Sequence, residues 1–177
     1  MNKTLIAAAV LATSAFSTNV SAAAGTVNFT GDILLTGCEV SGDNGTTSQE
    51  VKLGKLWVNE LTVGGAPVAG KNFTLKLVNC PDTAKKAVIR FEGEQVPNVQ
   101  NTSLLALTDA PDAAKGVAIQ ILDNQDKVIN LREDSMEYAL QASPAVNELN
   151  FSARYYAYAA PKAGSANAVT NFSIFYR

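Results

Sequence analysis

Hydrophobic and polar residues alternate along most of this chain beyond its N-terminal segment. The clearest run is 147–158, where one face carries Leu149, Phe151, Ala153, Tyr155 and Ala157. Shorter runs with the same period lie at 71–79, 86–91, 116–122 and 171–177. A period of two places successive side chains on opposite faces, as in a β-strand with one buried face. These segments therefore predict strands, and no comparable run shows a helical period.

Turn-forming residues separate the predicted strands. Gly, Pro, Asn and Asp cluster at 42–45, 64–67, 80–82, 109–112, 123–126 and 143–144, and these residue types favour turns. Several short strands at such spacing are typical of a β-sandwich or barrel. Because neither an internal repeat nor a linker divides this part of the chain, we predict one all-β domain of about 155 residues, an immunoglobulin-like sandwich.

Residues 1–22 have the features of a secretory signal peptide. Lys3 gives a positive start, residues 5–12 form a short apolar core, and Val20-Ser21-Ala22 supplies a small-residue cleavage site. Cleavage one residue later, after Ala23, is an alternative. The apolar run is shorter than the roughly 20 residues that a membrane-spanning helix needs. We therefore expect export and cleavage rather than a membrane anchor.

Export changes the interpretation of the two cysteines, Cys38 and Cys80. An oxidising compartment favours a disulfide between them. Closing a loop of about 43 residues corresponds to roughly 4 kcal/mol in the chain-entropy description. Free thiols, or a metal site built on two cysteines, are the alternatives.

Composition restricts the chemistry that the chain can perform. Its 177 residues are 47% hydrophobic and 17% charged, with a net charge of −2 and no histidine. The charge gives no basic footprint for nucleic acid, and the lack of histidine excludes Ser-His-Asp, Cys-His and His-metal sites. We expect no enzyme activity, no cofactor and no nucleic-acid partner.

Three local features allow more specific interpretations. Asp123, Asp126, Glu133 and Asp134 form an acidic cluster, but its spacing is not that of an EF-hand, so a solvated loop is the preferred interpretation. The single tryptophan, Trp57, could stack on a sugar, although a structural role is expected. Tyr155, Tyr156 and Tyr158 fit core packing, surface packing or subunit contacts equally well.

The two ends of the predicted domain carry further strand patterns. Residues 26–35 place Val27, Phe29, Gly31, Ile33 and Leu35 on one face. A glycine inside a strand marks a bulge or a close approach of another surface, and an ordinary first strand is the alternative. At the other end the chain stops inside a strand whose one face carries Phe172, Ile174 and Tyr176, and Gly164 lies in the turn that precedes it.

Taken in order, these features resemble the chaperone–usher pilins, most of all the major or minor structural subunits of type 1 fimbriae. The resemblance rests on the signal peptide, the alternating arm with a central glycine, Cys38 and Cys80, Gly164 and the penultimate Tyr176. The stretch 153–157 and the Asn79-Cys80 ending of a strand are also similar to the family.

The resemblance implies an incomplete immunoglobulin-like sandwich that lacks its final strand and is completed by a donor strand from a neighbouring subunit. Residues 23–37 would form the donor arm and 38–177 the pilin domain, with donor positions Val27, Phe29, Gly31, Ile33 and Leu35. The positions that line the groove or contact the chaperone would be Gly164, Phe172, Ile174, Tyr176 and Arg177. A basic cleft of the chaperone would bind the carboxylate of Arg177, which replaces the commoner neutral or polar last residue.

The implied function is a structural subunit of an adhesive fimbria. Its partners would be other pilin subunits, a periplasmic chaperone and an outer-membrane usher, and its destination, through the periplasm, would be the cell surface. A secreted immunoglobulin-like binding module, or a minor adaptor or adhesin subunit, is the alternative.

Overall fold

The computed structural model describes residues 27–31, 36–42, 47–64, 68 and 70–177. The chain divides into two units, Met1–Ile33 and Leu34–Arg177. In the first unit, the described residues 27–31 form neither helix nor strand. The predicted signal peptide, Ile33 and Leu35 lie outside the described residues.

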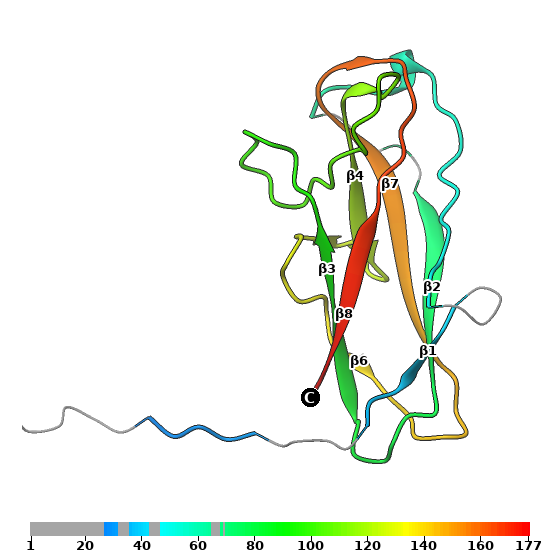
Figure 1. Cartoon of the computed structure of the whole chain (residues 1–177), viewed down its shortest axis with the longest axis vertical. Coiled ribbons are helices and arrows are strands. Elements are labelled where there is room, and N and C mark those ends of the chain that lie inside the picture. Colours follow the sequence, from blue (N-terminus) through cyan, green and yellow to red (C-terminus); the bar gives the residue numbers. More distant parts are fainter. Residues whose placement is uncertain (1–26, 32–35, 43–46, 65–67, 69) are drawn as a thin grey trace, which may run out of the picture. The chain divides into compact units, whose positions relative to one another are not determined.

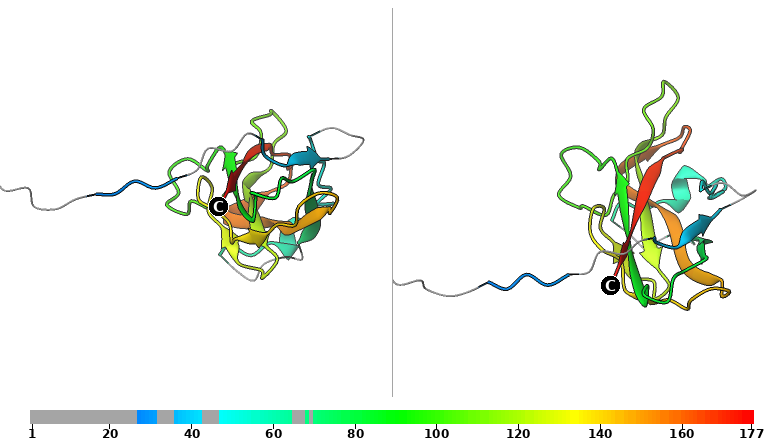
Figure 2. Two further views of the ribbon diagram at one scale, coloured as in Figure 1. Left: turned by 90° about the horizontal axis from the view of Figure 1, so that it is seen from below. Right: turned by 60° about the horizontal axis from the view of Figure 1, so that its bottom comes forward.

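Two antiparallel sheets build the second unit (Figure 1). The larger sheet has the order β1-β2-β7-β4-β5, from the strands Glu39–Ser41, Lys71–Val78, Asn147–Lys162, Lys115–Asp123 and Val128–Ile129. The smaller has the order β6-β3-β8, from Tyr138–Ala139, Lys86–Gly93 and Thr170–Tyr176. Figure 2 shows β3 and β8 side by side in one layer, with β7 and β4 in the other. This arrangement confirms the predicted all-β, immunoglobulin-like sandwich.

The core lies between the sheets, on the faces that the alternation predicted. Leu77 and Leu149 of the larger sheet and Ile89 of the smaller one are almost completely buried. The ring of Phe151 packs 5.3 Å from that of Phe91, centroid to centroid, across the two layers. Each large apolar side chain buried in this way contributes about 1.5–3 kcal/mol to the transfer free energy, so this packing is the main stabilising term of the domain.

Strand β4 is buried on both faces, which simple alternation did not predict. The segment 95–106 lies against β4 in two ways. Leu105 bridges to Ile119 along the edge of the strand, and Val96 and Leu104 pack on Ala118 at the outer face. Tyr156 and Tyr158 pack against the same cluster. The outer tyrosines of β7 are therefore packing residues.

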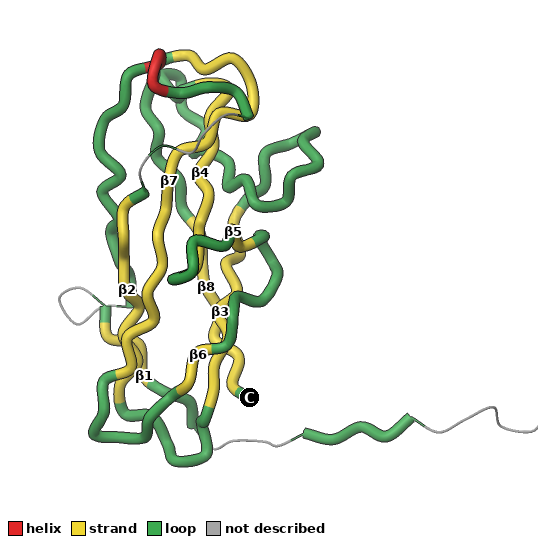
Figure 3. Tube along the Cα trace, turned by 180° about the vertical axis from the view of Figure 1, so that it is seen from behind, coloured by secondary structure: helices red, strands yellow, loops and turns green. Residues whose placement is uncertain are grey.

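A single 3-10 turn, η2 (Val58–Glu60), is the helical element of the described residues. It lies at the opposite end of the domain from the C-terminus, as Figure 3 shows in red. Within the part of the chain that the structure describes, no helix is long and apolar enough to cross a membrane.

Candidate functional site

Strand β8 is an edge strand and pairs with β3 alone, along residues 170–176. Phe172, Ile174 and Tyr176 turn toward the core and pack against it, yet each remains only partly buried. By contrast, Leu149, a core-facing residue of the inner strand β7, is 1% exposed. The sandwich is therefore open beside β8.

A groove of about 660 Å³ occupies this open side. One wall is β8 with the residues 168–169 before it, and the other is the segment 47–53. The floor consists of core side chains, among them Leu75, Phe91 and Ile119. Because the floor is apolar and part of the core, water in the groove is a poor substitute for apolar side chains.

The second wall was missed by the sequence analysis. Gln49, Val51 and Leu53 are partly buried, whereas Glu50 and Lys52 between them are exposed. This is again a period of two, but over a segment too short to stand out. A search for short alternations between the first cysteine and the strand at 71–78 would have found it.

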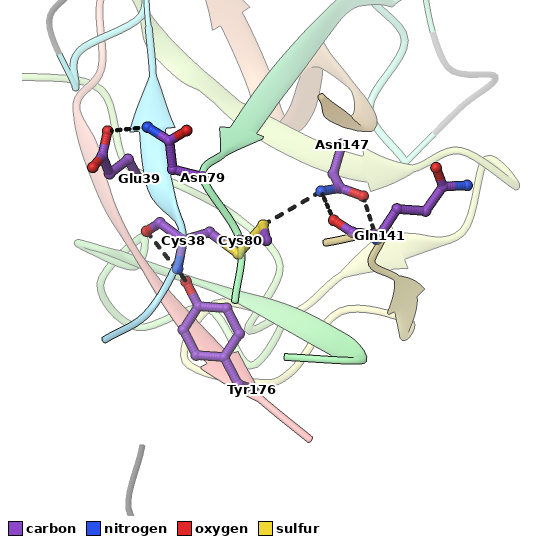
Figure 4. Close-up of a disulfide and its surroundings, with 7 residues drawn as sticks. All are labelled: Cys38, Glu39, Asn79, Cys80, Gln141, Asn147 and Tyr176. Carbon is purple, nitrogen blue, oxygen red and sulfur yellow. Dashed lines mark hydrogen bonds between the residues drawn. A yellow bond between two sulfur atoms is a disulfide. The ribbon is translucent and has the colours of Figure 1, made fainter. Parts of the chain in front are cut away.

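The phenol of Tyr176 joins the end of β8 to the first residues of the domain (Figure 4). The Cys38 N–H donates to Tyr176 Oη at 2.8 Å, and Cys38 forms the predicted disulfide with Cys80. A Cβ at Gly37 would lie 2.8 Å from the Tyr176 ring, so glycine permits this close approach. The contact ties β8 to the segment that leads into β1.

The other side of the disulfide is held by a buried amide. Asn147, at the start of β7, donates to Cys80 Sγ at 3.3 Å and to the Gln141 carbonyl at 2.9 Å. Its own oxygen accepts the Gln141 N–H at 2.7 Å. The buried amide is thereby satisfied, and it fixes the connection between β6 and β7 against the disulfide.

Gly164 lies outside the groove, in the connection between β7 and β8. A Cβ there would overlap the backbone of Asp112 and Ala114. The neighbouring Ser165 exchanges backbone hydrogen bonds with the same segment, 2.8 Å in each direction. Gly164 thus sets the turn that delivers β8 and does not touch the groove.

Arg177 continues the pairing of β8 with β3 and anchors its end. Its backbone exchanges hydrogen bonds with Lys86, at 2.9 and 3.1 Å. Its guanidinium lies 2.6 Å from Asp134, and Arg90 contacts the other oxygen of that carboxylate, also at 2.6 Å. The pKa of Asp134 lies below its ordinary value, mainly because its carboxylate accepts a hydrogen bond from Arg90. The charge of Arg90 and the contacts of Arg177 lower this pKa further, whereas partial desolvation raises it.

The described donor positions are exposed. Val27 and Phe29 leave 75% and 93% of their surface accessible, and a Cβ at Gly31 would meet no atom within 4 Å. Large apolar side chains this exposed cost free energy until something covers them. The assigned donor role stays a prediction.

One sequence interpretation needs correction. Asp123 is not in a solvated loop: it is 3% exposed and accepts the N–H groups of Gln125 and Lys127, which shapes the turn after β4. Trp57, for which a structural role was expected, leaves 79% of its surface exposed. Among the described residues, no group of three or more acidic or cysteine side chains is arranged to hold a metal ion.

Comparisons with known proteins agree with this geometry. A family profile described as "Fimbrial protein" matches residues 27–177. The chain is 32% identical to the type-1 fimbrial protein, A chain, of Escherichia coli K12, covering 99% of this chain and 98% of that one. It is 34% identical to a type-1 fimbrial protein subunit of Serratia marcescens, with 100% of both chains covered. The crystal structure of the P pilus rod subunit PapA shares the fold, with a TM-score of 0.64 at 21% identity, covering 80% of this chain and 100% of that one.

Proposed function

We propose that copies of this chain, which belongs to the fimbrial protein family, polymerise by donor-strand exchange. The chain is a structural subunit of a cell-surface fimbria. Residues 27–35 of one copy fill the groove beside β8 of the next. The observation that supports this most is the open groove with an apolar floor, which runs along an edge strand whose core-facing residues are only partly buried.

The arm has the chemistry of the missing strand. Val27, Phe29, Ile33 and Leu35, with Gly31 between the two pairs, follow a period of two, the spacing at which β8 presents its own core-facing side chains. Chaperone–pilin complexes are themselves an established example of such β-strand addition. Each apolar side chain would contribute about 1.5–3 kcal/mol on burial, and each new backbone hydrogen bond about 1 kcal/mol, before ordering costs are subtracted.

Geometry favours an arm that runs antiparallel to β8. A parallel arm would bring the donor domain to the Tyr176 end of the groove, which is also where the acceptor's own domain begins at Cys38. An antiparallel arm delivers the donor domain to the opposite end, near residues 168–170. Each copy then uses one end to donate and the other to accept, and such a head-to-tail contact generates an open filament.

Before polymerisation the groove is a hazard, because an apolar edge strand invites aggregation. A periplasmic chaperone would cover it and release the subunit at an outer-membrane usher. The guanidinium of Arg177 is paired with Asp134, so its charge does not oppose a basic cleft that binds the terminal carboxylate. Because the chain has both an arm and a groove, it suits a subunit inside the fibre better than a subunit that ends the fibre.

A peptide covering residues 25–37 tests the proposal directly. Added to the mature domain purified without a chaperone, it should raise the unfolding temperature markedly by filling the groove. The same peptide with Phe29→Asp, which would bury a charge, serves as the matched control and should have little effect. An unchanged unfolding temperature with the native peptide would contradict donor-strand exchange and favour an ordinary binding module.

Gly31 gives a second test in cells. We place Gly31 where the groove leaves no room for bulk, so Gly31→Leu should abolish fibres on the cell surface while the chaperone-bound monomer accumulates. Because a Cβ at Gly31 meets nothing in its own chain, the substitution should leave the domain itself folded. Fibres in normal number, seen by electron microscopy, would exclude the assignment of Gly31.

A further inference from the structure

The end of the domain opposite the C-terminus carries an exposed apolar surface around η2. Leu56, Trp57 and Val58, here the Trp57 patch, leave 37%, 79% and 40% of their surfaces exposed. They border a hollow of about 570 Å³ whose other wall is residues 161–167, the end of β7 and the start of the connection that follows it. Solvent-facing tryptophan beside a hollow is typical of an interaction surface, because tryptophan is enriched among the residues that dominate binding.

Local hydrogen bonds hold the Trp57 backbone in place while its ring faces solvent. The Trp57 N–H donates to the Glu60 carboxylate at 2.5 Å, and the Glu60 N–H donates back to the Trp57 carbonyl at 3.0 Å. The Leu61 N–H closes the turn on the Val58 carbonyl at 3.2 Å. The ring is therefore presented by an ordered turn.

The Trp57 patch is continuous with the groove. A third hollow, lined by residues 48–54 and 166–168, shares Val51 and Leu53 with the groove and Gly54 and Asn167 with the hollow beside Trp57. A strand that leaves the groove at residues 168–170 therefore emerges beside the Trp57 patch.

The length of the arm identifies which part of a neighbouring copy would lie beside the Trp57 patch. Only Thr36 and Gly37 separate the last donor position, Leu35, from Cys38. Three residue steps span at most about 10 Å. A donor whose arm fills the groove antiparallel to β8 must therefore place its own Cys38 end directly against this end of the acceptor.

We propose that the Trp57 patch is the docking surface for a second copy of this chain, at the end of that copy formed by residues 36–42 and 79–82. This inference rests on the proposed donor-strand exchange. The charges are complementary: Lys55 and Lys162 border the hollow beside Trp57, and the exposed Glu39 and Asp82 lie in the two segments of the opposite end. The contact makes successive domains touch and so stiffens the fibre beyond what the inserted strand provides.

Photo-crosslinking in assembled fibres tests the contact. The variant Trp57→p-benzoyl-phenylalanine should give covalent dimers on illumination, with the crosslink mapped by mass spectrometry to residues 36–42 or 79–82 of the neighbouring copy. The matched control is the same replacement at Phe175, an exposed aromatic that lies against Arg90 instead; it should give no crosslink to those segments. Crosslinks from position 57 that map elsewhere, or none between copies, overturn the inference.

Fibre stiffness is the second measurement. Fibres of Trp57→Ser should assemble, because the groove is intact, but should show a severalfold shorter persistence length by electron microscopy than fibres of the native chain or of Phe175→Ser. The 25–37 peptide should still raise the unfolding temperature of the Trp57→Ser domain, which shows that it is folded. If Trp57→Ser fibres are as stiff as native fibres and the peptide still raises the unfolding temperature, the Trp57 contact is overturned but donor-strand exchange is not. If the peptide does not raise the unfolding temperature of the native domain, both proposals are overturned.

Discussion

Strands β7 and β8 follow one another in the chain, and both alternate apolar and polar residues, yet they end in different environments. β7 lies between β2 and β4, and its core-facing Leu149 and Phe151 are 1% and 2% exposed. β8 has β3 on one side only, and its core-facing Phe172 and Ile174 remain partly exposed. The same binary pattern therefore produces a finished interior at one strand and an unfinished one at the next.

The chain supplies neighbours on both sides of β7 but on only one side of β8. Around β7 every partner comes from the same domain, and even the outer face of the adjoining β4 is covered by the segment 95–106. Around β8 the other wall, 47–53, stands across the groove and forms no ladder with it in the described residues. A strand from another copy is the natural completion.

Truncation of one core residue from each strand should expose this difference most strongly. Leu149→Ala should lower the free energy of unfolding by about 3 kcal/mol, because it leaves a cavity in closed packing. Ile174→Ala should cost only about 1 kcal/mol in the isolated domain, because its side chain is already partly exposed. Chemical denaturation with and without the 25–37 peptide measures both. The cost of Ile174→Ala should rise when the peptide is bound, and an equal cost in both conditions would mean that the peptide does not cover Ile174.

Gly164 tests how β8 is delivered to its place. Gly164→Ala should lower the stability of the domain by about 2 kcal/mol, because the new methyl group overlaps the backbone of Asp112 and Ala114 and forces that segment to move. Gly31→Ala is the matched control, since its methyl group meets no atom, and it should leave the unfolding midpoint unchanged. Equal midpoints for the two variants would contradict the tight turn.

Tyr176→Phe removes the hydrogen bond that joins β8 to Cys38. The loss should be about 1 kcal/mol, the cost of leaving a partly buried N–H without its acceptor. Thermal unfolding of the variant measures it, and faster hydrogen exchange at the Cys38 amide should accompany it. Native exchange at that amide would show that the phenol does not hold the segment.

The smallest expected effect concerns pH and the end of β8. The pKa of Asp134 is lowered from 3.8 by its arginine partners, so the ionised carboxylate stabilises the folded state above that value and loses its contribution as the pH falls through the lower folded pKa. Asp134→Asn should therefore cost about 0.5 kcal/mol at neutral pH, because the arginines are partly solvent-screened, and almost nothing at the acid end. Asp82→Asn, at an exposed site, serves as the control. A cost that persists unchanged in acid would point to packing instead of charge.

Much of the fold could be predicted from the period of two. It located β2, β3, β4, β7 and β8, because each of these strands spans seven or more residues. It gave no signal for β1, β5 and β6, which span two or three residues. It also could not show that Ala118 and Gln120 on the outer face of β4 are buried, because the residues that cover them come from a distant loop.

The candidate site was predictable in part. The tyrosine at 176 and the alternation over 171–177 pointed to β8, and a disulfide was the favoured interpretation of two cysteines in a chain expected to be exported. The short alternation around Val51 and Leu53 is a local signal, but it does not show that this segment lies across a groove from β8. The exposure of Trp57 depends on which surfaces the rest of the chain leaves uncovered, and a local pattern does not contain that information.

The contact of Tyr176 with Cys38 has a mechanical consequence. In the proposed polymer a pull along the filament would enter each domain through Cys38, the residue that follows the proposed arm. The disulfide to Cys80 passes the load into β2, and the phenol passes it into β8. Strands β2 and β8 both lie beside the groove that would hold the arm of the next copy. The force would therefore pass between successive copies over a short distance and would load little of the domain core.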